Sequence, residues 1–319
     1  MDKKLTKESW INLITAVILG GFLMYLSKSF GELITAFQVF PLLVMYINDG
    51  WKMTLLAWVG TVALGLLFVD PITLAYLALF MLLGTLFAGY RIVNKKKLGN
   101  TILYTAFIKL LLFGGLMAVA FYMEGKNPIE IARGLMYESV DKMADTLNKG
   151  LEMTPKEVET YLETARELVD KGIELIPAIM FIASYLSSAI NIFLALKVAK
   201  ASGKDLGYVT KVNEYGATKD LKIASVVVGV ICLIALVLNL EYSEMFVWNL
   251  LYVMFFFYLI NGFLLIDRMY EKSGRKIMRV LVPVLLLLFL RSLFVYVVVG
   301  FIDMLFNIRE RMLTGGKKK

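Results

Sequence analysis

Polar side chains inside apolar segments are the residues of this chain whose types and spacing could do chemistry. Four of them lie in segment 173–196 at the spacing i, i+3, i+4 and i+7, which places them on one helical face: Ser184, Ser187, Ser188 and Asn191. At membrane depth such hydroxyl and amide groups need partners, either across a helix interface or in a solute-filled cavity. The stripe therefore predicts interhelical hydrogen bonding or a solute site, and the sequence does not decide between them.

Three further polar residues extend the candidate solute site. Gln38 lies in segment 30–47, and Arg291 and Asp303 lie in the run 280–308. A permanent guanidinium in a low dielectric suits an anionic or mixed-polarity small molecule, because its hydrogen bonds are charge-assisted. The candidate solute-binding residues are thus Gln38, Ser184, Ser188, Asn191, Arg291 and Asp303.

Two other polar residues within apolar segments have simpler expected roles. Lys109 is expected to lie within reach of the inner membrane surface and to extend its amine there. Asn261 stands next to Gly262, a pair that allows close helix packing with an added hydrogen bond.

Catalytic chemistry finds little support in this composition. The 319 residues include no histidine, which excludes triads and metal sites that depend on imidazole. The phosphate-binding pattern G-x-x-x-x-G-K-[ST] does not occur, and no carboxylate pair lies at membrane depth. We therefore expect no enzyme, no catalytic or metal-ligating residues and no cofactor. A membrane enzyme acting on lipid-linked substrates is the weakest hypothesis.

The arrangement of apolar residues indicates the class of protein. Hydrophobic residues make up 59% of the chain and form blocks of about the length that a ~30 Å hydrocarbon layer requires. Helices satisfy every backbone amide within the segment, so these blocks predict an all-α, polytopic transmembrane bundle. Eight spans are expected, at 10–26, 30–47, 54–69, 72–90, 101–122, 173–196, 223–240 and 245–266.

Loop charges predict the orientation in a cell membrane. Lys3, Lys4 and Lys7 place the N-terminus in the cytoplasm, and most other basic clusters then fall on the same side. The same rule explains the net charge of +8 without a nucleic-acid partner. The expected partner of the protein is the lipid bilayer.

Segment 126–172 is expected to form an extracytoplasmic hairpin of two amphipathic helices. Asn127 with Pro128, and Thr154 with Pro155 and Glu157, are typical helix-start patterns. The hairpin would either pack on neighbouring loops or cover the mouth of a ligand site.

The run 280–308 could cross the membrane once or twice. A single helix places Arg291 near the bilayer midplane, where inserting an arginine costs at least about 2.5–3.5 kcal/mol. It also places the basic C-terminal tail outside the cell, against the positive-inside rule. We therefore favour a broken or re-entrant span. The expected organisation is a five-span bundle (1–125), the hairpin (126–172), a second bundle (173–308) and a basic cytoplasmic tail (309–319).

Several segments together resemble a known family. They are "FPLLVMYINDGWKMTLLAWVGTVALGLLF", "IPAIMFIASYLSSAINIFLALKVAK", "YLINGFLLIDR" and the closing pattern of Gly300, Asp303, Phe306, Asn307 and Arg309. In order and spacing they are similar to the YybS-type predicted membrane proteins of bacteria. The first part is also distantly similar to the S, or substrate-binding, components of energy-coupling-factor transporters.

That resemblance implies a polar intramembrane cavity reached from outside, a separate transmembrane coupling subunit and ATPases. The leading hypothesis is a solute-binding subunit of a small-molecule uptake system. The alternative is a membrane scaffold or assembly partner that binds another protein and no solute.

Overall fold

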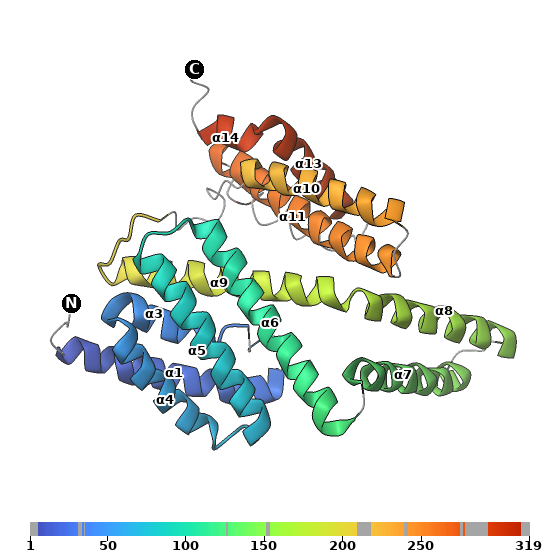
Figure 1. Ribbon diagram of the computed structural model, residues 1–319, viewed down its shortest axis with the longest axis horizontal. Helices are drawn as coiled ribbons and strands as arrows, with labels where there is room; N and C mark the ends of the chain where they lie inside the picture. The colour runs from blue at the N-terminus through green and yellow to red at the C-terminus, as the bar shows by residue number, and fades with distance from the viewer. Residues whose placement is uncertain are drawn as a thin grey trace.

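The apolar blocks of this chain form α-helices, because only a helix pairs all backbone amides within one apolar segment. The structure is a computed structural model that describes residues 6–30, 34, 36–125, 127–150, 154–208, 218–238, 242–274, 277 and 293–313. Every regular element in these residues is a helix (Figure 1). The helices are α1 (Lys7–Phe30), α3 (Val39–Asp49), α4 (Trp51–Gly65), α5 (Pro71–Val93), α6 (Leu98–Glu124), α7 (Pro128–Gly150), α8 (Pro155–Glu174), α9 (Ile176–Ala201), α10 (Thr218–Leu238), α11 (Ser243–Lys272), α13 (Leu293–Phe306) and α14 (Ile308–Leu313).

Six of the described helices contain segments long and apolar enough to cross a membrane. These are Lys7–Ser27, Pro71–Val93, Leu98–Met123, Ile176–Ala201, Asp220–Leu238 and Ser243–Lys272. The expected count of eight spans is not confirmed. Where the second span was expected, α3 has only 11 residues, about 17 Å of helix, which is much less than a ~30 Å core. The all-helical architecture and the multi-pass character agree with expectation.

The last apolar run is described only from Leu293 onward. There α13 has 14 residues, and α14 follows it after Asn307, whose backbone has a positive φ of 50°. Residues 278–292, and with them Arg291, lie outside the described residues. The re-entrant form of this run therefore stays a prediction, as do the expected domain boundaries.

Helices α1, α3, α4 and α5 pack together through a core that includes Leu42, Met45 and Met81. Polar bonds fix their ends and crossings. The Trp58 indole N–H donates to the carbonyl oxygen of Ala78 at 2.8 Å and so joins α4 to α5. The side chains of Ser9 and Asn12 in α1 donate to the carboxylate of Asp49, the last residue of α3, at 2.8 and 2.9 Å.

Helix α9 runs between this group and the group formed by α10, α11, α13 and α14 (Figure 1). It contacts α3 and α6 on one side and α11 on the other. A single asparagine on α11 fixes the start of α9, because Asn249 Oδ1 accepts from the backbone N–H of Ala178 at 2.9 Å. Asn249 Nδ2 donates to the carbonyl oxygen of Glu174, the last residue of α8, at 2.7 Å. One side chain thus caps two helix ends.

Replacing Asn249 by alanine is expected to lower the free energy of unfolding by about 1–3 kcal/mol, because it removes the partner of the buried Ala178 N–H and of the part-buried Glu174 C=O. Thermal unfolding in lipid nanodiscs measures this loss. Asn94→Ala is the matched control, since Asn94 Nδ2 also donates to a backbone carbonyl, that of Tyr90, but at an exposed position. Equal melting temperatures for the two variants would contradict the capping role.

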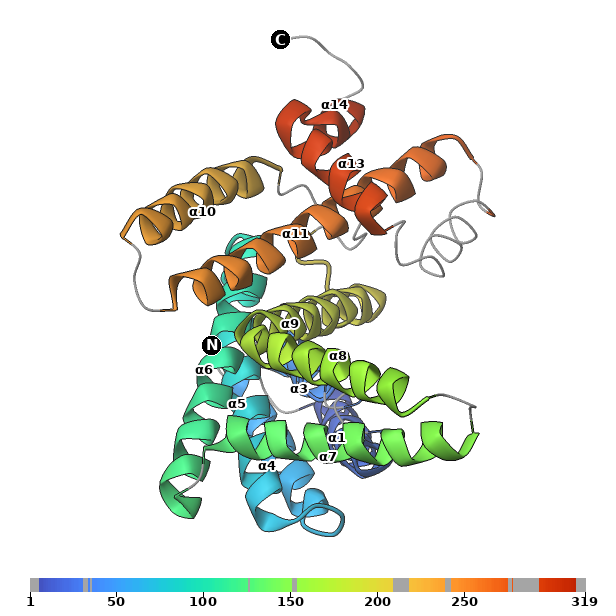
Figure 2. The same cartoon turned by 90° about the vertical axis from the view of Figure 1, so that its right-hand side faces the viewer.

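Helices α7 and α8 lie side by side and project away from the other helices (Figures 1 and 2). Their N-terminal signals act as expected. Asn127 Oδ1 accepts from the Ile129 N–H at 3.0 Å, and Thr154 forms a reciprocal capping box with Glu157. These bonds from Thr154 lower the pKa of the Glu157 carboxyl below its usual value.

Polar contacts join the exposed parts of α7 and α8. Arg166 pairs with Asp141 at 2.8 Å, and the Tyr137 hydroxyl donates to both oxygens of Asp170 at 2.8 Å. The side of a membrane on which these two helices lie stays a prediction.

Candidate solute site

The polar stripe of α9 is buried on one face, as its spacing predicts. Ser184, Ser187, Ser188 and Asn191 are between 1% and 9% exposed. Ser187 Oγ donates to the carbonyl oxygen of Ala36 at 2.9 Å, and Asn191 Nδ2 donates to the same carbonyl. Part of the stripe therefore joins α9 to the turn that precedes α3.

Lys109 on α6 lies against this stripe, and the expectation that it reaches the membrane surface is wrong. Its side chain is 1% exposed. Nζ donates to Ser187 Oγ at 2.7 Å and lies 4.7 Å from the centre of the Phe80 ring. The physical reason is depth: eleven residues separate Lys109 from the start of α6, about 16 Å along the helix axis. The sequence signal that could have predicted a buried lysine is therefore the distance of Lys109 from the end of its apolar segment.

Gln38 is the residue that precedes Val39, the first residue of α3. It is fully buried, and neither its Oε1 nor its Nε2 has a hydrogen-bond partner among the residues that the structure describes. The adjacent Val39 and Lys109 both approach Gly84 of α5: a Cβ there would lie 3.6 Å from Val39 Cγ2 and 3.8 Å from Lys109 Cε. The start of α3, the middle of α5 and the Lys109 side chain therefore meet at Gly84. Thr85, the next residue, is also fully buried.

We call these six residues the Lys109 cluster: Gln38, Thr85, Lys109, Ser187, Ser188 and Asn191. Four of them carry buried atoms without a hydrogen-bond partner in the described part of the chain, namely Gln38 Oε1 and Nε2, Thr85 Oγ1, Ser188 Oγ and Asn191 Oδ1. Buried polar atoms without partners are rare in folded proteins, and each costs about 1–3 kcal/mol. The cluster can bind a polar molecule by hydrogen bonds and charge. It contains no carboxylate for acid–base chemistry.

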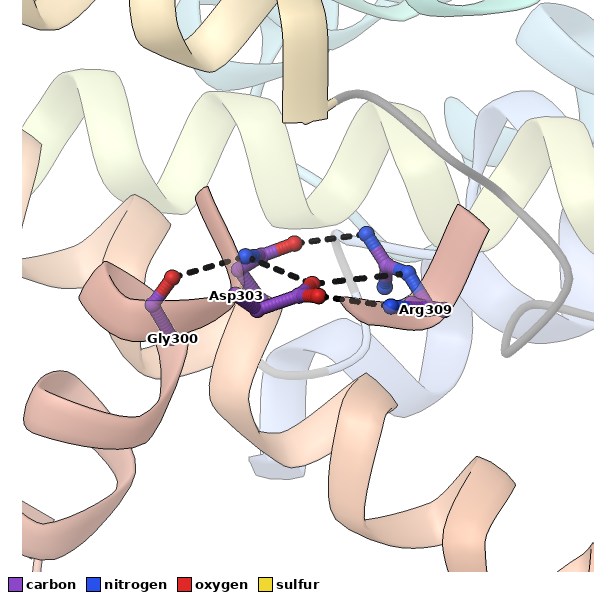
Figure 3. A network of polar contacts seen from close by, with 4 residues as sticks. Gly300, Asp303 and Arg309 are labelled. Carbon is purple, nitrogen blue, oxygen red and sulfur yellow. Dashed lines mark hydrogen bonds and ion pairs between the residues drawn. The ribbon is translucent and has the colours of Figure 1, made fainter. Parts of the chain in front are cut away.

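Asp303 belongs to a second buried network, on the other side of α9 from α3 (Figure 3). Its Oδ1 accepts from the backbone N–H of Arg309 at 2.8 Å, and its Oδ2 accepts from Asn261 Nδ2 at 3.1 Å. Arg309 Nη2 donates to Asn261 Oδ1 at 2.6 Å, and Arg309 Nε lies 3.8 Å from Asp303 Oδ2. The structure thus separates Asp303 from Gln38, Ser188 and Asn191, with which it was grouped. Arg291 lies outside the described residues.

Asn261 has the expected role of a hydrogen bond beside a close helix crossing. Its Nδ2 also donates to the carbonyl oxygen of Gly300 on α13 at 2.9 Å. At this crossing the two backbones touch: a Cβ on Gly262 would lie 2.0 Å from the carbonyl oxygen of Tyr296, and one on Gly300 would lie 1.8 Å from that of Tyr258. Only glycine fits either position, which explains the glycines at residues 262 and 300.

A cavity of about 560 Å³ lies between α6, α9, α10, α11 and α14. Its lining is mainly apolar and includes Leu103, Ile190 and Phe257, while Asn261 and Arg309 supply polar atoms. It is therefore not the polar cavity that the resemblance implied. The Lys109 cluster is closed to the surface in this conformation, since its side chains are 6% exposed or less.

A comparison with protein families decides the membership of the chain. The family described as "Predicted membrane protein (DUF2232)" matches residues 13–304, which is most of the sequence. The chain belongs to this family. The match confirms the expected membership of a family of predicted membrane proteins, and the family's description names no activity. No match was found among curated proteins or among solved structures, so the similarity to S components is not confirmed.

Proposed function

We propose that this DUF2232 protein is the solute-binding subunit of a small-molecule uptake system, with the Lys109 cluster as its site. One observation carries the proposal: α3 with its N-cap, α5, α6 and α9 bury a lysine as well as amide and hydroxyl groups that the described residues leave without partners. Burying such groups makes the free energy of folding less favourable, because no hydrogen bond replaces those that they formed with water. A bound polar solute would supply the missing hydrogen bonds.

The partners and the topology belong to the same proposal. The protein would lie in the cell membrane with eight spans and a cytoplasmic N-terminus, and α7 and α8 would form the extracytoplasmic hairpin. As the resemblance to S components implies, energy would come from a transmembrane coupling subunit and ATPases, and the lack of a G-x-x-x-x-G-K-[ST] loop in the 319 residues is consistent with this division. Because the cluster is closed, solute entry would require α3 or α6 to move away from α9.

A membrane scaffold without a solute is the second candidate. It is favoured by the hydrogen bonds from Ser187 and Asn191 to the Ala36 carbonyl, which join helices in the way expected of structural polar residues. In this alternative the cluster would serve packing only, and the protein would bind another protein.

Gln38→Leu separates the two candidates, because the Gln38 side chain has no hydrogen bond to any described residue that its removal could break. The experiment is native mass spectrometry of the protein purified in nanodiscs from its own host membranes. We expect a bound small molecule in the wild type and at least tenfold lower occupancy in Gln38→Leu and in Ser188→Ala. Tenfold corresponds to about 1.4 kcal/mol, roughly one hydrogen bond.

The control for this experiment is Thr15→Val, which removes an exposed hydroxyl of α1 that bonds only locally, to the Ile11 carbonyl. Its occupancy should equal that of the wild type. A co-purifying protein with no small molecule would favour the scaffold. A solute retained in both Gln38→Leu and Ser188→Ala would place the site elsewhere.

A further inference from the structure

Two cationic side chains are buried among the described residues, and only one of them lies close to a carboxylate. Arg309 and Lys109 are each 1% exposed. Arg309 lies within 3.8 Å of Asp303, a carboxylate that is itself fully buried. Asp303 is the only buried carboxylate in the described part of the chain, and its bonds go to Asn261 and Arg309. The buried arginine therefore has a counter-ion of its own, whereas Lys109 forms no ion pair with a described residue.

The contacts of Lys109 satisfy its donors only in part. An ammonium group has three N–H donors and no acceptor. Ser187 Oγ accepts one of them at 2.7 Å, and the face of the Phe80 ring attracts the charge from 4.7 Å. A hydroxyl and a ring stabilise a cation, but neither neutralises it. An uncompensated charge in a low-dielectric interior costs several kcal/mol.

The neighbouring groups add donors rather than a negative charge. Gln38 Nε2, Ser188 Oγ and Thr85 Oγ1 can each donate, and none has a partner among the described residues. The acceptors without partners among the described residues are all neutral: the amide oxygens of Gln38 and Asn191 and the hydroxyl oxygens of Ser188 and Thr85. A buried cation without a carboxylate partner is complementary to an anion, because charge-assisted hydrogen bonds to an oxyanion are about twice as strong as neutral ones.

We propose that the solute is a carboxylate, whose anionic group pairs with Lys109 and supplies a counter-charge that the described residues give Arg309 but not Lys109. This inference rests on the proposed solute-binding function. The single positive charge of the cluster favours a monoanionic carboxylate over a phosphate dianion, which would leave a net buried negative charge. The free amide oxygens of Gln38 and Asn191 would accept from a hydroxyl, amide or amine elsewhere on the same solute.

The wild-type protein in native nanodiscs provides the deciding test. The bound molecule is released, its mass is measured, and its carboxyl groups are converted to carboxamides with a carbodiimide and ammonia. We expect the mass to change by the difference between a carboxyl and a carboxamide group. A phosphate-bearing solute, a lipid headgroup included, or a neutral or cationic solute would overturn the carboxylate assignment and leave the solute-binding function intact. No bound solute at all would overturn both.

Variants of Lys109 add a test at the residue itself. Lys109→Met removes the charge while keeping an unbranched side chain, and Lys109→Arg keeps the charge. We expect at least tenfold lower occupancy in Lys109→Met and partial retention in Lys109→Arg. Solute-free Lys109→Met should also melt at a higher temperature than the solute-free wild type, because an uncompensated buried charge is gone. Equal loss of solute in both variants would contradict a charge-based role, and the identity of the wild-type solute decides the proposal even where a variant fails to fold.

Discussion

Asp303→Ala is expected to destabilise the protein by about 3–5 kcal/mol, the cost of removing one partner from a buried charge pair. The side chains of Asp303 and Arg309 are 0% and 2% exposed, so water cannot replace the lost carboxylate. The same substitution removes the acceptor of the Arg309 backbone N–H and one acceptor of Asn261. The measurement is thermal unfolding in nanodiscs, and the melting temperature should fall well below that of the wild type.

The double variant Asp303→Leu with Arg309→Met is the informative companion to this experiment. Replacing both partners of a buried ion pair by apolar residues is often nearly neutral, because no uncompensated charge remains. We therefore expect it to recover much of the stability that Asp303→Ala loses. If Asp303→Ala melts at the wild-type temperature, the carboxylate does not hold α14 against α11 and α13.

Gly300→Ala is the second substitution with a large expected effect. The added Cβ would lie 1.8 Å from the carbonyl oxygen of Tyr258 and 2.6 Å from the backbone nitrogen of Gly262. Both atoms belong to the backbone of α11, so no side chain can rotate away and the two helices must separate. Overpacking usually costs about 1–3 kcal/mol, and this backbone clash is expected to reach or exceed the upper end of that range.

Gly229→Ala on α10 serves as the matched control for Gly300→Ala. No atom lies within 4 Å of the position that its Cβ would take, and the residue is inside a helix. Alanine there should raise helix stability by up to about 1 kcal/mol, since glycine is the poorer helix former. Opposite shifts in melting temperature for the two glycines would confirm the close α11–α13 crossing. Shifts of the same sign would contradict it.

Local signals in the sequence were sufficient for the helical class and for the starts of α7 and α8. Thr154 and Glu157 act within one turn of a helix, so their capping box could be predicted from spacing alone. The apolar blocks likewise predicted the helical membrane class, because the bilayer requires long helices whatever their neighbours are. The number of spans was harder, since adjacent apolar blocks do not reveal how short a helix such as α3 is.

The Lys109 cluster illustrates the limit of local signals. The spacing of Ser184, Ser187, Ser188 and Asn191 placed them on one face of α9, and that face is buried. The spacing could not show which helices cover it. Lys109 and Ser187 are 78 residues apart, and nothing in the sequence around either residue identifies the other as its partner.

What the sequence by itself determined is therefore the class of the protein, the ends of several helices and the polar face of α9. Periodicity and capping operate over three or four residues, a range that any single segment contains. Only the tertiary structure decided that Asp303 pairs with Arg309 and Asn261, and that Lys109 turns inward to a cluster without a carboxylate. These pairings depend on how helices cross, and crossing is fixed by packing between segments far apart in the chain.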